Sequence, residues 1–106
     1  MDHFEMRRSD RVTTSIRLLV SGNNGAGSFF MEETTTVAVS LRGARIVLKQ
    51  MVAPSTDVLV RNIATGAEAD MQIIGKLADG PGGYHYALRL LVDINIWGID
   101  FGYGRW

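Results

Sequence analysis

The sequence predicts an all-β fold, a small antiparallel β-barrel of six or seven strands that follows a flexible N-terminal arm. Apolar and polar residues alternate with a period of two from Ser15 onward, which is the pattern of half-buried strands. Glycine-rich turns separate these stretches, and no segment sustains the apolar spacing of a helix. A closed barrel removes exposed sheet edges, so we prefer it to an open sandwich.

The length of 106 residues allows one domain and leaves no room for a second core. We expect an arginine-rich arm over residues 1–14, the barrel over residues 15–101 and a short C-terminal tail over residues 102–106. Strands should cover the regions around residues 15–20, 29–39, 44–48, 57–61, 69–74 and 84–90. The inward positions of these strands are Ile16, Leu18, Val20, Ala44, Ile46, Leu48, Val58, Val60, Ala69, Met71, Ile73, Tyr84, Tyr86, Leu88 and Leu90.

Three segments rich in glycine or small residues predict tight connections between consecutive strands, at residues 22–27, 64–67 and 79–83. Strands joined by such short turns are antiparallel, because parallel pairs need long crossovers. The last segment, Trp97–Phe101, resembles a closing strand with its large side chains packed inward. Residues 92–97 have room for one helical turn before it.

Composition excludes several classes of function. The chain carries 11 Lys and Arg against 11 Asp and Glu, so bulk charge predicts no binding to a nucleic-acid polymer or an anionic membrane. It contains no cysteine and only two histidines, and we therefore expect no disulfide and no metal site. No apolar run reaches the ~20 residues that cross a bilayer, and the N-terminus lacks the apolar stretch of a signal peptide. We expect a cytoplasmic protein.

No arrangement of residues predicts catalysis. Residues 22–27 look like a phosphate loop, but a strand rather than a helix follows them, so a hairpin turn is the better interpretation. His85 lies in an alternating strand, where a surface or partly packed histidine is expected rather than a general base. The acidic residues have no partner that would form an acid–base pair. We expect no catalytic residue and no cofactor.

The N-terminal arm concentrates positive charge in an otherwise neutral chain. Arg7, Arg8 and Arg11 precede the first predicted strand, and Arg17 follows them. Guanidinium groups pair with phosphates and guanine edges and stack on flat rings. The arm therefore has the chemistry to hold a small anionic nucleotide, although a solvated basic tail is the simpler interpretation of composition alone.

Two short motifs give the chain a resemblance to the PilZ domain family. Arg7-x-x-x-Arg11 on the arm matches the first family motif, Arg-x-x-x-Arg. Residues 38–43, Ala-Val-Ser-Leu-Arg-Gly, match Asp/Asn-x-Ser-x-x-Gly at the end of a strand, except at the first position. The order of the motifs and the strand pattern extend the resemblance over nearly the whole chain.

The resemblance implies a non-catalytic module that binds the bacterial second messenger cyclic di-GMP. Arg7 and Arg11 would hold guanine edges and phosphates, Ser40 and Gly43 would form the platform, and Arg8 and Arg42 would add positive charge. In such modules ligand capture rearranges the arm, which would report to a protein partner or another domain. Ala38 is the departure, because a methyl group cannot accept the hydrogen bond that Asp or Asn would.

Two alternatives remain. A divergent PilZ-like domain could have lost the nucleotide and act as a protein-interaction module, with the outward apolar residues Leu19, Val47, Leu59 and Ile74 covering a partner or a second subunit of a homodimer. A barrel for single-stranded nucleic acid would need a basic face with exposed aromatic rings, for which the sequence gives little support.

Overall fold

Seven β-strands account for most of the residues that the computed structural model describes, residues 11–101. They are β1 (Val12–Thr13), β2 (Arg17–Asn23), β3 (Phe29–Ser40), β4 (Gly43–Leu48), β5 (Thr56–Asn62), β6 (Glu68–Gly80) and β7 (Gly83–Leu90). Within this described range no helix is long and apolar enough to cross a membrane.

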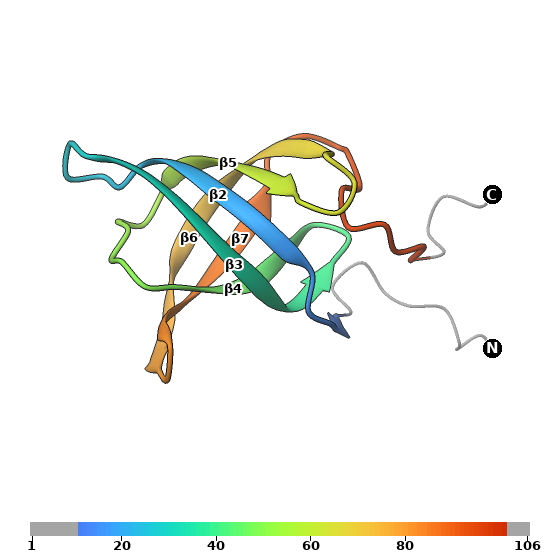
Figure 1. Cartoon of the computed structure of the whole chain (residues 1–106), viewed down its shortest axis with the longest axis horizontal. Helices are drawn as coiled ribbons and strands as arrows, with labels where there is room; N and C mark the ends of the chain where they lie inside the picture. Colours follow the sequence, from blue (N-terminus) through green and yellow to red (C-terminus); the bar gives the residue numbers. More distant parts are fainter. Residues whose placement is uncertain (1–10, 102–106) are drawn as a thin grey trace.

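The strands form one closed antiparallel barrel (Figure 1). Their order is β3-β2-β5-β6-β7-β4, and β4 pairs with β3 again to close the sheet. The short strand β1 is added to β3 beyond the end of β2. The predicted all-β barrel is therefore confirmed, as six strands in the closed ring and one short extra strand.

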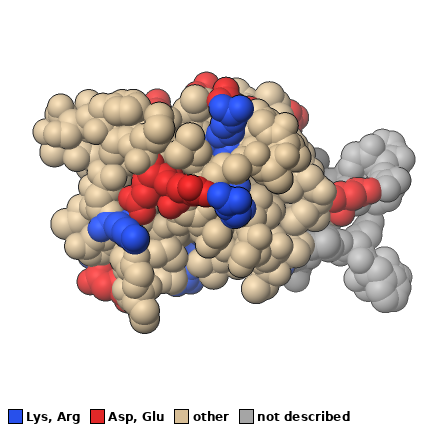
Figure 2. All heavy atoms as spheres, viewed as in Figure 1, with Lys and Arg blue, Asp and Glu red and all other residues tan. Residues whose placement is uncertain are grey.

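Alternation along the strands builds the core as the sequence predicts. The side chains with the lowest exposure come from every strand of the closed ring and include Leu18, Val39, Ile46, Val60, Met71, Ile73 and Tyr86. Burying one apolar side chain of this kind stabilises the fold by about 1.5–3 kcal/mol. Charged side chains stay outside, and Figure 2 shows acidic groups in the middle of one face with basic groups beside them.

The connections at residues 22–27, 64–67 and 79–83 are hairpin turns, as predicted. Gly25 in the first of them has a φ of +88°, and a Cβ there would lie 2.5 Å from the Cβ of Ala53. Glycine is needed because the β2–β3 turn packs against the β4–β5 loop, where the N–H of Ala53 donates to the carbonyl of Asn24 (3.0 Å).

Thr36 is a buried polar residue of β3. Its hydrogen bonds hold the short segment that connects β1 and β2. Its backbone N–H donates to the carbonyl of Ile16 (3.0 Å). Its hydroxyl accepts from the N–H of Ile16 (2.9 Å) and donates to the carbonyl of Thr14 (2.5 Å). Strand pairing begins at Val12, three residues before the alternation that the sequence shows, and the Thr36 side chain supplies contacts across the break between β1 and β2.

The C-terminal segment after β7 differs from the prediction. Residues 91–101 form neither the closing strand nor the helical turn that the sequence suggested. Trp97 and Phe101 are nevertheless buried, as expected. Side-chain hydrogen bonds hold the segment in place of a ladder: the buried Asn62 donates from Nδ2 to the carbonyl of Ile96 (2.8 Å), and Trp97 Nε1 donates to the carbonyl of Ser40 (3.0 Å).

Replacing Thr36 by valine should lower the free energy of unfolding by about 1–3 kcal/mol, because the N–H of Ile16 and the carbonyl of Thr14 lose their partner. Urea denaturation of the variant and the unmodified protein measures the difference. Thr35→Val is the matched control, since Thr35 is exposed on the same strand, and it should change stability by less than about 0.5 kcal/mol. Equal losses in the two variants would contradict the role given to the Thr36 hydroxyl.

Candidate functional site

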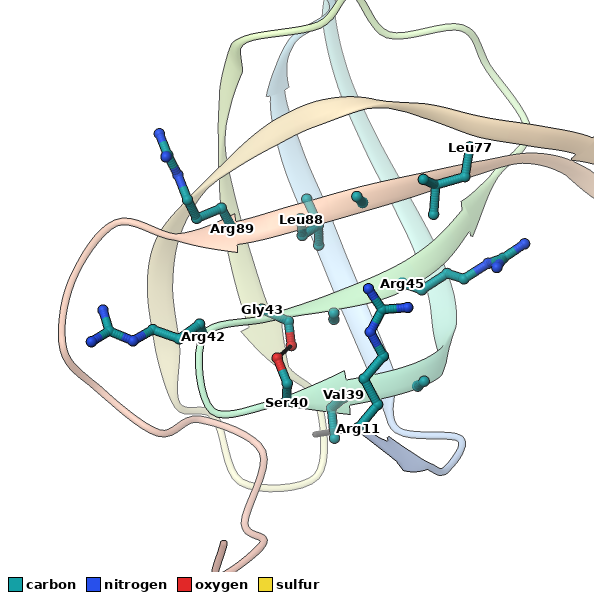
Figure 3. A pocket seen from close by; sticks show the side chains of 12 residues that line it. Arg11, Val39, Ser40, Arg42, Gly43, Arg45, Leu77, Leu88 and Arg89 are labelled. Atoms are coloured by element: carbon teal, nitrogen blue, oxygen red, sulfur yellow. Dashed lines mark hydrogen bonds between the residues drawn. The ribbon is translucent and has the colours of Figure 1, made fainter. Parts of the chain in front are cut away.

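A small surface hollow lies where the end of β3, the start of β4 and the end of β7 meet (Figure 3). Its volume is about 160 Å³. The residues that line it come from four strands (β3, β4, β6 and β7), the residue before β1 and the β3–β4 turn. They are Arg11, Ala38, Val39, Ser40, Arg42, Gly43, Ala44, Arg45, Leu77, Ala87, Leu88 and Arg89. Four of the six residues proposed from the sequence, Arg11, Ser40, Arg42 and Gly43, are among them.

The second motif forms the tight turn between β3 and β4. Ser40 and Gly43 are paired across the ladder, and the Ser40 hydroxyl donates to the carbonyl of Gly43 (3.5 Å). The carbonyl of Ser40 accepts from Trp97 Nε1 (3.0 Å), and the carbonyl of Arg42 accepts from the N–H of Leu90 (2.8 Å). The turn is thus held by β7 on one side and by the C-terminal segment on the other.

Gly43 is glycine because β7 passes directly over it. A Cβ at this position would lie 2.0 Å from the carbonyl oxygen of Leu88, closer than any real contact. Its φ is not in the left-handed region, so backbone conformation is not the reason. The glycine of the motif therefore brings β4 and β7 together at the rim of the hollow.

Small side chains give the hollow a flat floor. Ala38 on β3 and Ala87 on β7 are the ladder partners of Arg45 on either side of β4. Arg45 is half-buried between them. The position that departs from the family motif, Ala38, therefore lines the hollow.

Arg11 reaches the hollow from the N-terminal side. β1 pairs Val12 with Val39 and Thr13 with Ala38, which places Arg11 beside the end of β3. Figure 3 shows its side chain extending along the hollow toward β4. Arg7 and Arg8, the other arginines predicted to bind a ligand, lie outside the residues that the structure describes.

Arg45 and Arg89 are lining residues that the sequence interpretation did not include. Arg45 Nε donates to His85 Nδ1 (3.2 Å), and Arg89 Nη2 donates to Gln72 Oε1 (2.8 Å). Arg45 follows the motif directly on β4 and pairs with Ala38 across the β3–β4 hairpin, so a search of the strand next to the motif could have found it. Arg89 reaches the motif only through the pairing of β4 with β7, where it lies opposite Gly43. Those strands are about 40 residues apart in sequence, so no local pattern could have identified Arg89.

The charge around the hollow is of one sign. Its lining contains four arginines and no acidic residue. None of the four forms an ion pair with another residue in the range 11–101. Figure 3 shows Arg42 and Arg89 projecting at one end and Arg45 at the other, with Arg11 between them. Such an arrangement attracts an anion.

A second pocket of about 380 Å³ lies at the other end of the barrel, between the β2–β3 turn and the β4–β5 loop. Its walls include Met51, Val52, Pro54 and Tyr86 and are mostly apolar. Lys76 also lines the pocket. A side-chain hydrogen bond with Asp79 raises the pKa of Lys76. None of the described residues proposed from the motifs (Arg11, Ser40, Arg42 and Gly43) lines this pocket.

Comparison with solved structures identifies the fold. The chain is similar to the crystal structure of the PilZ domain of CeSA from a cellulose-synthesizing bacterium, with a TM-score of 0.57 and 23% sequence identity. The match covers 81% of this chain and 84% of that domain. No protein-family model matches the sequence, and no curated protein does. The domain therefore has the PilZ fold, as the two motifs implied.

Gly43→Ala should lower the free energy of unfolding by at least about 2 kcal/mol, because the added methyl group forces β4 away from β7. Thermal and urea denaturation measure the loss. Gly75→Ala is the matched control: no atom lies within 4 Å of the Cβ it would add, so its stability should be unchanged or slightly higher. A stable Gly43→Ala protein would show that the close approach does not constrain this position.

Proposed function

We propose that this domain is a non-catalytic bacterial signalling module that binds cyclic di-GMP at the arginine-lined hollow. Arg7 and Arg11 form the clamp for phosphates and guanine edges, and Ser40 and Gly43 form the platform. Arg8 and Arg42 supply further positive charge. The ligand class follows from the resemblance to the PilZ family, and the PilZ fold supports it.

The observation that carries the proposal is the meeting of the two motifs in one hollow. Arg11 belongs to the first motif, and Ser40 and Gly43 belong to the second, yet all three line the same depression. Guanidinium groups bind phosphate oxygens through paired, charge-assisted hydrogen bonds. Cyclic di-GMP carries two phosphates, so a hollow with four arginines and no lining carboxylate is suited to it.

The hollow is smaller than the roughly 300–1,000 Å³ of most pockets that enclose a ligand. Cyclic di-GMP would therefore lie across it, with one part on the floor of Ala38 and Ala87 and the other part held by the arm. Closure of the arm over the ligand supplies the remaining contacts. This movement is the change that a protein partner or a neighbouring domain in the cytoplasm would detect, since a ligand shifts the population toward the conformation it binds best.

Ala38 lowers the affinity that the site can reach. A carboxylate or amide at this position would accept a hydrogen bond from a guanine edge, and a methyl group cannot. The missing bond costs about 1–3 kcal/mol, or roughly 5- to 150-fold in affinity. Arg45, opposite Ala38 in the ladder, replaces part of this contribution through its charge.

Isothermal titration with cyclic di-GMP tests the proposal. Arg11→Ala and Arg7→Ala should each weaken binding by at least about tenfold, because each removes a charge-assisted contact worth about 1.5–3 kcal/mol. Lys49→Ala is the matched control, since Lys49 is an exposed cation that does not line the hollow, and its affinity should be unchanged.

A folded protein that shows no heat of binding with cyclic di-GMP would overturn the proposal and favour the protein-interaction module as the function. Binding that survives both arginine substitutions would place the ligand elsewhere.

Ala38→Asn should strengthen binding of cyclic di-GMP by at least about fivefold, because it restores a hydrogen-bonding group in the hollow. The same titration measures it. Ala87→Asn introduces the same group on the other side of Arg45 and should give no such gain. Equal effects from both variants would show that position 38 has no special contact with the ligand.

A further inference from the structure

The outer face of β3, β2 and β5 carries an apolar patch that the proposed function does not use. Leu18, Val20 and Phe30 point inward and are buried, so their neighbours on these strands point outward. Among those neighbours Phe29 is 69% exposed, Met31 is 60% exposed and Leu59 is 38% exposed. Figure 2 shows few charged groups at its upper left, on the part of the face toward the β2–β3 turn, and Asp57 is the exposed acidic residue at the β5 side of it.

The register places these side chains symmetrically about β2. Ser21 of β2 lies between Met31 of β3 and Leu59 of β5. Apolar groups of similar size therefore flank the central strand at equal positions on its two sides. Directly opposed residues in neighbouring strands lie within about 5.5 Å of each other, so the two flanking groups belong to one continuous surface.

At the next outward position along β2, charged residues instead of apolar ones flank the central strand. Leu19 lies between Glu33 of β3 and Arg61 of β5. Glu33 is already paired with Arg17 of β2, but a carboxylate has lone pairs for a further guanidinium. The face thus carries a carboxylate on the β3 side of β2 and a guanidinium on the β5 side.

We propose that a second copy of the chain binds this face through a two-fold axis that runs along β2. Such a rotation exchanges β3 and β5, so that Met31 packs against Leu59 of the second copy and Leu19 packs against its counterpart. Glu33 then faces Arg61 of the second copy, and this ion pair forms twice. The Met31–Leu59 and Glu33–Arg61 positions are complementary under the same operation, as a closed, isologous dimer requires. Arg17, the next outward residue of β2, lies near the axis and keeps its pair with Glu33 of the same copy.

The size of the face is consistent with a weak dimer. Its apolar side chains offer an area on the order of 300 Å² in each copy. A specific interface needs on the order of 1,000 Å² in total, so the polar rim must supply part of the buried area. A second copy is favoured over an unrelated partner because the charges on the two sides of β2 match each other. The hollow involves the opposite end of β3 and is left open.

Sedimentation equilibrium of the full chain over a range of concentrations tests the proposal. The mass should rise from 11.7 kDa toward twice that value with increasing concentration. Met31→Asp should remove the dimer. Ile74→Asp is the matched control, because Ile74 is a 45% exposed apolar residue of β6 outside this face, and it should leave the association unchanged.

A charge exchange tests the geometry itself. Glu33→Arg alone and Arg61→Glu alone should each weaken association at least tenfold, and the double variant should recover it. Circular dichroism of each variant verifies that the barrel is folded. A monomer at every concentration, association that Ile74→Asp weakens as much as Met31→Asp does, or a double variant without recovery would overturn the proposal.

Discussion

The architecture depends on one strand, β3, which changes its neighbours partway along its length. Its first half pairs with β2, and its second half pairs with β1 and β4. The buried hydroxyl of Thr36 stands where this change occurs and bonds to both sides of the gap between β1 and β2. A buried polar group is tolerated only when its hydrogen bonds are satisfied, so Thr36 ties the N-terminal segment to the barrel where β3 changes its neighbours.

The hollow follows from that closure. Once β4 returns to β3, the β3–β4 turn must lie beneath β7, and only a glycine at position 43 lets the strands approach so closely. The same closure brings Ala38, Arg45 and Ala87 into one row on the outer surface. The pairing of β3, β4 and β7 thus places the residues of the hollow. Small residues leave the depression open, and arginines surround it.

The sequence predicted the strands and turns because alternation and glycine position are local properties. It failed at residues 91–101, where Asn62 and Trp97 hold an irregular segment through side-chain bonds that leave no periodic trace. It located Arg11, Ser40, Arg42 and Gly43 through short motifs. It did not include Arg45, although Arg45 directly follows the second motif and pairs with Ala38. It could not locate Arg89, because its place in the hollow depends on the register between two distant strands. The prediction that Arg7 and Arg8 bind the ligand concerns residues outside the described range.

Both ends of the described chain meet the same end of β3. Val12 pairs with Val39, and Trp97 donates its indole hydrogen to the neighbouring residue, Ser40. The polypeptide therefore enters and leaves the barrel side by side, next to the hollow. A domain with this connectivity can be inserted within a larger polypeptide without separating the flanking segments, and both covalent connections would experience any displacement of the β3–β4 turn. Mechanical coupling to attached sequences is then a property of the connectivity itself, whichever molecule occupies the site.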